Sequence, residues 1–238
     1  MNITQTTAIE KDPSVKSVKH LLRTDPINAL INHLDRFSAE DIEVACELCP
    51  GQTLQFVSNL LTPKQFNHCC RRDTYTGIMF FAGRMSDRLF SACAEQHPMP
   101  ALNWFSQRLT KRQFSRCVEQ CPDIAIISLT CRARLTGQQL NYCISMCPAA
   151  ALEWVGGLLT DVQFAYCVDK KPWQALLFVP SRLESEQLVR IASDHPESID
   201  EHFREYPDTD LLKVLAPYLN RFDDATKVVV ANQIARTI

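Results

Sequence analysis

Glycine is scarce in this chain, which has only 6 glycines among its 238 residues. Phosphate-cradling loops and dinucleotide-binding turns are built from clustered glycines, so this composition argues against nucleotide-binding motifs. The sequence also lacks G-x-S-x-G, H-E-x-x-H and Walker motifs. We therefore expect a protein that is not an enzyme and that needs no cofactor.

Long apolar runs and a strong excess of one charge are missing too. No stretch approaches the roughly 18–20 apolar residues of a membrane-spanning helix, and the formal net charge is only −2. The apolar share of 46% is typical of a globular protein and excludes collagen-like and fully disordered classes. We expect no contact with a membrane.

Cysteine, by contrast, is abundant, with 11 residues. The odd number argues against a complete disulfide framework. Residues 1–12 are polar and lack the apolar stretch of a secretory signal. Because reduced thiols are typical of a cytosol-like compartment, the sequence predicts a cytoplasmic protein with a cysteine-rich core.

A repeat of 24 residues dominates the sequence. Its marker is a proline, once a threonine, and successive markers are 24 residues apart except for one step of 26. The markers are Pro26, Pro50, Thr74, Pro98, Pro122, Pro148, Pro172 and Pro196. An internal period of this length is the signature of a repeat architecture.

Each repeat predicts two short helices. The first begins at the marker and places apolar residues four, seven and eleven positions later, as in Leu102, Phe105 and Leu109. The second follows a Ser or Thr in six repeats, and in four of these a Gln stands three residues on, as in Thr110 and Gln113, which is the capping-box signature of an α-helix. Because neither helix can bury its apolar stripe alone, we expect the repeats to stack into a continuous core.

These signals predict an all-α fold with a single α-solenoid domain over residues 14–238, after a flexible segment at residues 1–13. Seven helix pairs of 24 residues are expected over residues 26–196, with capping helices at 14–24 and 208–237. The longer step places its two additional residues within 130–134, where we expect a bulge at the surface.

The period, with its pattern of P-x-x-A-L followed by R-L-T-x-x-Q-F-x-x-C, resembles short-period helical-repeat proteins of the α-solenoid group. This group includes HEAT-like arrays and leucine-rich-repeat-variant proteins. The latter family, whose repeat alternates an α-helix with a 3₁₀-helix, can carry a cysteine-bound iron–sulfur cluster ahead of its repeats. No cysteine precedes Cys46, so the resemblance implies a repeat fold without that cluster.

One repeat position is occupied by five cysteines, which we expect to pack in the core: Cys69, Cys93, Cys117, Cys143 and Cys167. The alternative is a metal site that uses Cys117, Cys121, Cys143 and Cys147. Zinc requires four ligands at about 2.0–2.3 Å, whereas neighbouring helices lie about 10 Å apart. Packing is therefore the preferred interpretation, and no metal site is predicted.

Two further columns predict a binding surface on the first helices. An arginine stands fourteen residues before most markers, and an aromatic residue precedes it by four, so we expect pairs such as Phe80–Arg84 to stack. The alternative is structural, with arginines at helix carbonyls and aromatics packed between repeats. The candidate binding residues are Phe80, Arg84, Trp104, Arg108, Arg112, Arg116, Arg134 and Trp154.

Charge is distributed unevenly along the chain. Residues 64–134 contain 11 basic and 5 acidic residues, whereas residues 180–224 contain 5 basic and 11 acidic residues. The basic stretch predicts a protein-interaction module of the adaptor, inhibitor, immunity or effector type that binds an acidic or extended partner segment. The alternative is binding of RNA or another single strand, with bases stacked on the aromatic residues.

Overall fold

The computed structural model describes residues 18–207 and 210–237, and in this part of the chain all regular structure is helical. The predicted all-α fold class is thus confirmed. The chain divides into two compact units, Met1–Ala101 and Leu102–Ile238, which we call the N-terminal and C-terminal units. The flexible segment predicted at residues 1–13 lies outside the described residues.

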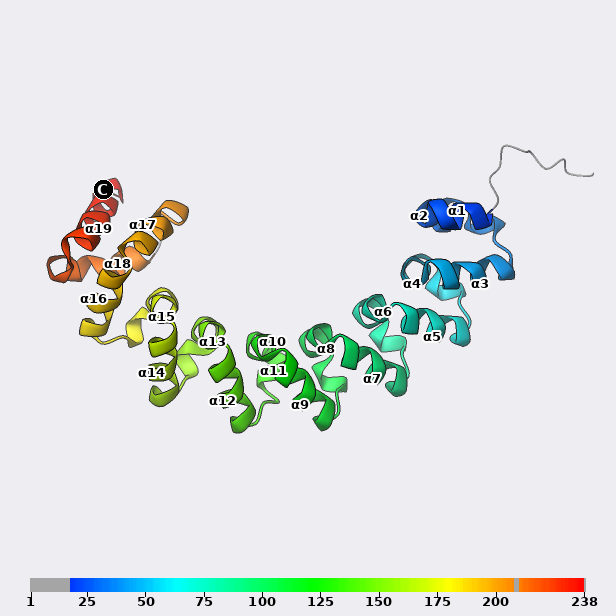
Figure 1. Cartoon of the computed structure of the whole chain (residues 1–238), viewed down its shortest axis with the longest axis horizontal. Helices are drawn as coiled ribbons and strands as arrows, with labels where there is room; N and C mark the ends of the chain where they lie inside the picture. Colours follow the sequence, from blue (N-terminus) through cyan, green and yellow to red (C-terminus); the bar gives the residue numbers. More distant parts are fainter. Residues whose placement is uncertain (1–17, 208–209, 238) are drawn as a thin grey trace, which may run out of the picture. The chain divides into compact units, whose positions relative to one another are not determined.

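Short helices follow one another in both units (Figure 1). Up to the unit boundary the helices are α1 (Val18–Thr24), α2 (Pro26–Asn32), α3 (Ala39–Leu48), α4 (Pro50–Val57), α5 (Pro63–Arg72), α6 (Thr74–Phe81) and α7 (Asp87–Gln96), and α8 (Pro98–Phe105) contains the boundary. The C-terminal unit continues with α9 (Lys111–Gln120), α10 (Pro122–Ile127), α11 (Leu129–Arg132), α12 (Gly137–Met146), α13 (Pro148–Val155), α14 (Asp161–Lys170), α15 (Pro172–Phe178), α16 (Ser185–Asp194), α17 (Pro196–Glu205), α18 (Leu211–Leu215) and α19 (Asp224–Thr237).

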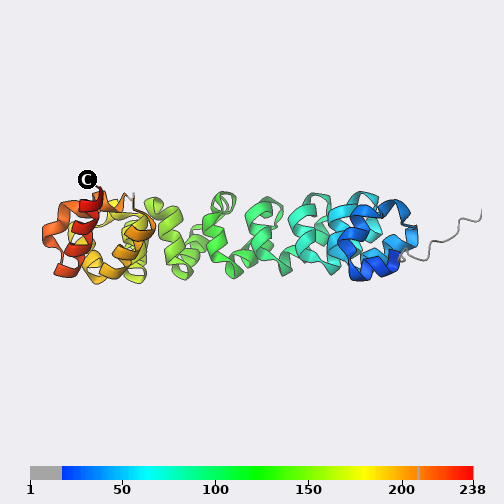
Figure 2. The same cartoon turned by 90° about the horizontal axis from the view of Figure 1, so that it is seen from above.

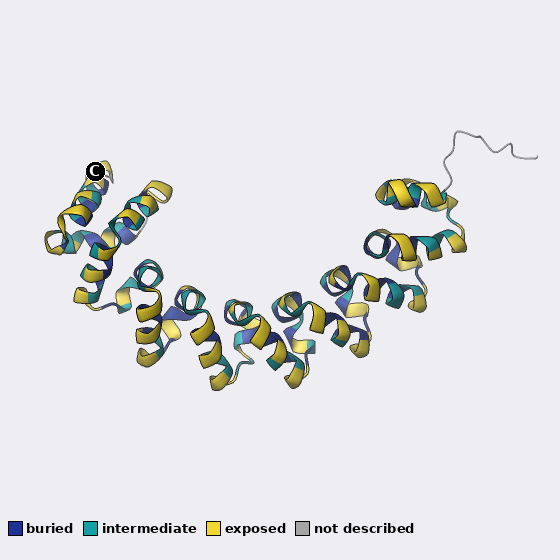
Figure 3. Cartoon of the chain, in the orientation of Figure 1, coloured by how far each residue is buried: buried dark blue, intermediate teal, exposed yellow. Residues whose placement is uncertain are grey.

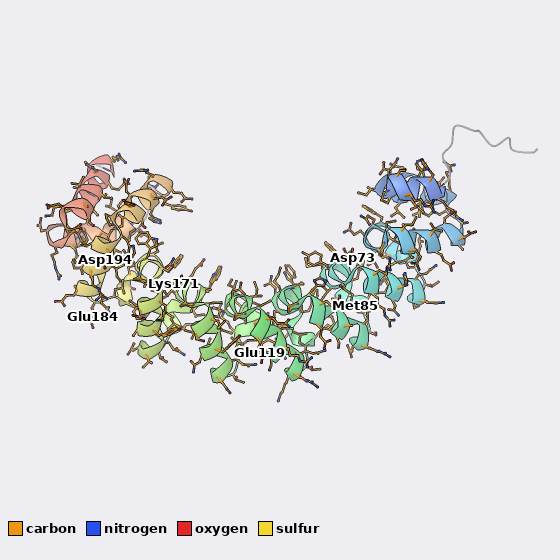
Figure 4. The ribbon with its side chains drawn as sticks, in the orientation of Figure 1. Asp73, Met85, Glu119, Lys171, Glu184 and Asp194 are labelled. Carbon is orange, nitrogen blue, oxygen red and sulfur yellow. The ribbon has the colours of Figure 1, made fainter. Side chains whose placement is uncertain are left out.

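A helix begins at every repeat marker, as predicted. Proline suits this first position because its missing N–H would have no partner there. The second helices begin after their predicted caps. Thr110, for example, accepts a bond from the Gln113 backbone N–H at 3.3 Å, and the Gln113 side chain accepts one from the Thr110 backbone N–H at 2.9 Å. In Figure 4, Asp73 and Lys171 mark the turn that links a second helix to the next first helix.

The first helices are shorter than predicted. In α8 the last residue, Phe105, has φ −130° and ψ 21°, outside α-helical geometry. A 3₁₀ turn, Ser106–Arg108, follows it. The same change of backbone geometry occurs at Phe81, which has φ −127° and ψ 11° and precedes the 3₁₀ turn Ala82–Arg84. The last residue of the apolar stripe, Leu109, therefore lies beyond the α-helix and directly after the 3₁₀ turn.

The core is formed by repeat positions that face neighbouring helices (Figure 3). The residues four positions after the first seven markers are at most 1% exposed: Leu30, Leu54, Ile78, Leu102, Ile126, Leu152 and Leu176. The five cysteines that share one repeat position are also buried. In each unit successive first helices, such as α4 and α6 or α13 and α15, pack side by side, in agreement with Figures 1 and 2.

Two expected segments have a different organisation in the structure, and a third is described only in part. The segment with the two additional residues, 130–134, contains most of a short helix, α11, whose buried Cys131 thiol donates to the Leu102 carbonyl at 3.0 Å, while Thr130 and Ala133 are exposed. Of the two closing helices expected within residues 208–237, the first is divided into α18 and a 3₁₀-helix, Ala216–Arg221, with Pro217 at its second position, and the second corresponds to α19. The helix predicted over residues 14–24 is described from Val18 on, and residues 14–17 and 208–209 lie outside the described part.

Candidate functional site

The aromatic column lies at the surface. All five of its members are substantially exposed: Phe56 (41%), Phe80 (63%), Trp104 (53%), Trp154 (46%) and Phe178 (44%). The alternative in which these rings fill the space between repeats is therefore wrong. We call Phe56 and Phe80 the N-terminal rings, and Trp104, Trp154 and Phe178 the C-terminal rings.

Helical geometry explains this exposure. In α13 the core side is made by Leu152 and Val155, which are 0% and 6% exposed. Trp154 is two residues from Leu152 and one from Val155, so at 100° per residue it points away from the side that the two share. Neighbouring first helices pack about 8–10 Å apart, so we expect the rings of Trp154 and Phe178, on α13 and α15, to have a similar spacing.

The arginine column makes contacts between repeats. The guanidinium of Arg182 lies 4.3 Å from the ring centroid of Phe164, on the second helix of the preceding repeat. Its Nη1 donates to the carbonyls of Gly156 at 2.6 Å and Leu159 at 2.9 Å, at the 3₁₀ turn of that repeat. Cation–π stacking and charge-assisted hydrogen bonds thus join two successive repeats. We call this arrangement the arginine clamp.

Two other arginines form the same clamp, one in each unit. Arg84 lies 4.5 Å from the centroid of Phe66 and donates to the Ser58 carbonyl at 3.2 Å. Arg134 lies 4.4 Å from the centroid of Phe114 and donates to a backbone carbonyl at 3.0 Å. The guanidinium groups of these candidate binding residues already have structural partners.

The predicted stacking within one helix is therefore incorrect for Arg84. It assumed that Phe80 and Arg84 lie one turn apart on a continuous α-helix. Phe81 leaves helical geometry between them, so the arginine is turned toward the preceding repeat. The alternative, in which the arginines bond helix carbonyls, is nearer to the observed role. The carbonyls, however, belong to the preceding repeat and not to the arginine's own helix.

The remaining candidate residues belong to the C-terminal unit. Arg112 and Arg116 lie one turn apart on α9 and are exposed, whereas Arg108 ends the 3₁₀ turn Ser106–Arg108 and is half-buried. Two exposed cations on one helix give this unit a local positive charge. The structure thus separates the predicted set into exposed rings, exposed arginines on α9, and arginines at inter-repeat turns.

Burial sets the chemistry of the cysteines. Transfer from water raises the pKa of the Cys93, Cys143 and Cys167 thiols to about 11, because burial penalises the thiolate. A thiol that stays protonated at neutral pH is a poor nucleophile and a poor metal ligand. Over the part of the chain that the structure describes, no three His, Cys, Asp or Glu side chains are grouped so that they could hold a metal ion.

None of the described helices is long and apolar enough to cross a bilayer. Comparison with known proteins found no similar family model, curated protein or solved structure.

Proposed function

We propose that this chain is a non-catalytic protein-interaction module whose exposed rings bind an extended partner segment. The observation that carries the proposal is the regular exposure of large aromatic side chains at one repeat position. Aromatic residues supply much of the binding energy at protein interfaces, because a rigid ring buries a large area with little loss of conformational entropy.

The ring spacing indicates the form of the partner. Rings about 8–10 Å apart match side chains three residues apart in an extended segment of the polyproline II type, in which every third side chain lies on the same face and the chain advances about 3.1 Å per residue. A partner segment with anchors at every third position would therefore place one side chain against each ring of an adjacent pair, such as Trp154 and Phe178.

Charge adds a preference for acidic partners. Arg112 and Arg116 are exposed on α9, and exposed basic charge accelerates association with an acidic segment. We propose that the rings hold the partner and that α9 attracts it. The arginines of the clamp have a structural role in this proposal.

Nucleic-acid binding is the second candidate, because exposed rings also stack on bases. The two candidates differ in salt dependence. Binding to phosphates weakens steeply and linearly in log–log form as salt is raised, whereas binding of an apolar segment to the rings does not.

The test is affinity capture of partners from a cell lysate. It compares the full chain with a variant that combines Trp104→Ser with Trp154→Ser. A matched control is Val162→Ser, which removes an apolar side chain that is 82% exposed on α14, away from the ring column. We expect one protein to be captured by the wild type and by the control, to survive nuclease, and to be lost with the ring variant. Equal capture by all three proteins contradicts the proposal, and nuclease-sensitive capture favours the nucleic-acid candidate.

A further inference from the structure

A cavity of about 680 Å³ in the C-terminal unit has an unusual lining. It lies between the ends of α15 and α17 and the start of α18. Three rings line it together with aliphatic side chains and a single carboxylate: Phe178, His202, Tyr206, Leu177, Leu211 and Glu205. We call it the aromatic pocket.

Two of the rings that line the pocket, His202 and Tyr206, pack against each other. The His202 ring lies 5.1 Å from that of Tyr206 and 6.3 Å from that of Trp173, centroid to centroid. Burial lowers the pKa of His202 below its usual range, so the imidazole is neutral at pH 7 and adds no positive charge to the wall.

The lining of the pocket also carries a negative charge, that of Glu205. Glu205 hydrogen-bonds the Tyr206 hydroxyl and thereby raises the pKa of Tyr206. The surrounding helix α17 (PESIDEHFRE) contains four acidic residues and one arginine, and that arginine, Arg204, pairs with Asp200. The pocket thus combines aromatic rings with a carboxylate in its lining, which makes it electrostatically complementary to a cation.

The shortage of hydrogen-bond acceptors narrows the type of cation. A primary ammonium or a guanidinium carries three to five N–H donors, each of which needs an acceptor when it leaves water. Among the lining side chains, the only acceptors besides the Tyr206 hydroxyl are the carboxylate of Glu205, which already accepts from that hydroxyl, and one nitrogen of the neutral His202 ring. A fully methylated ammonium has no N–H donor and loses little on entering such a site.

We propose that the aromatic pocket binds a quaternary ammonium group against the rings of Phe178, His202 and Tyr206, with Glu205 balancing its charge. A cavity of about 680 Å³ is far larger than this group alone, so the group is carried on a longer body. Two sources share this chemistry: a small molecule of the choline type, and a trimethylated lysine side chain of a partner protein. The aromatic pocket shares only Phe178 with the ring column of the proposed function.

The test measures binding to the full chain by calorimetry, with choline and with the amide of Nε-trimethyl-lysine as probes. The uncharged isostere 3,3-dimethylbutan-1-ol, which has the shape of choline without its charge, is the control ligand. We expect both cations to bind more tightly than the alcohol, and the tighter of the two to identify the source. Equal binding of choline and the alcohol would overturn the proposal.

Variants locate the binding site. Tyr206→Leu removes one ring, and we expect it to weaken binding of the cation about three- to tenfold, given the usual strength of a cation–π contact. Tyr75→Leu is the matched control, because Tyr75 in the N-terminal unit is 48% exposed, against 53% for Tyr206, and also packs on a histidine ring. Unchanged affinity in Tyr206→Leu would overturn the proposal.

Two additional variants show whether lost binding comes from a folding defect, and they distinguish ammonium binding in the aromatic pocket from partner binding by the ring column. Glu205→Gln keeps the shape of the pocket and should weaken the cation severalfold while leaving helicity by circular dichroism unchanged. The Trp104 and Trp154 variant should bind choline normally, and Tyr206→Leu should still capture the protein partner. Loss of ammonium binding in the tryptophan variant, with the wild-type fold retained, would contradict the assignment to the aromatic pocket.

Discussion

The arginine clamp makes a prediction that depends on its geometry. Arg182→Met keeps most of the aliphatic stem but removes the guanidinium that lies over Phe164 and bonds the carbonyls of Gly156 and Leu159. Both carbonyls belong to buried residues, so no other donor replaces the arginine readily. We expect a clear loss of stability with no effect on the exposed rings.

The magnitude follows from the contacts that are lost. A hydrogen bond to a charged group contributes about 1.5–3 kcal/mol, and a cation–π contact about 0.5–1 kcal/mol where it is partly exposed. The ion pair of Arg182 with Asp161 adds nothing measurable, because Asp161 is fully exposed. Since such contributions are not additive, we expect Arg182→Met to lower the free energy of unfolding by about 2–4 kcal/mol. Thermal unfolding of a chain of this size should shift by about 5–15 °C.

Urea and thermal unfolding, followed by circular dichroism at 222 nm, measure this loss. Arg182→Lys keeps the charge but not the planar fork, so its loss should be intermediate. Arg190→Met, at an exposed arginine on α16, is the matched control and should stay within about 0.5 kcal/mol of the wild type. If Arg182→Met were as stable as Arg190→Met, the clamp would have no energetic role and the reasoning would be refuted.

Thiol titration of the native protein should show two fast cysteines, Cys121 and Cys147, because the other nine are buried; fast reaction of more thiols would contradict the core. Thr160→Ala should lower the free energy of unfolding by about 1 kcal/mol through loss of its cap, measured in urea against wild type. Cys117→Asp should prevent folding, because an unpaired carboxylate replaces a buried thiol. A melting temperature of this variant equal to that of the wild type would refute the placement of this repeat position in the core. By NMR, His202 should titrate below its ordinary pKa. The unfolded chain then takes up the proton first, so stability falls as pH drops below about 6.5.

The sequence was informative wherever the structure is determined locally. A helix start or a cap, such as Thr110 with Gln113, depends on residues within one turn of each other. The helix starts at the markers and these caps were predicted at the right positions. The 3₁₀ turns were not predicted, because the change at Phe81 and Phe105 is not encoded by a breaker such as proline or glycine at those residues. This change of backbone direction places the cap of the next helix where that helix can pack against its neighbours. It is therefore determined by packing between helices and not by the local sequence.

The exposure of the rings was left open for a related reason. An aromatic residue at helical spacing fits a core as well as a surface, and only the position of the core side decides between them. Leu152 and Val155 define that side in α13 and leave Trp154 outside it. The cavity beside His202 could not be inferred at all, since it depends on how the ends of α15 and α17 meet the start of α18.

The arginine clamp, however, has a signal in the sequence that pairing within one helix overlooks. Arginine occupies its column where the second helix of the preceding repeat carries phenylalanine, as in Phe66 and Arg84 or Phe164 and Arg182. Where that residue is aliphatic, at Ile42 and Leu140, the column holds Leu60 and Leu158, which are 55% and 82% exposed. The arginine thus occurs only together with a phenylalanine in the preceding repeat in these pairs. This indicates a contact between repeats, since a ligand-binding surface would not require the two residues to occur together. The hypothesis of partner binding therefore depends on the exposed rings and on α9, and its decisive variants are those of Trp104 and Trp154.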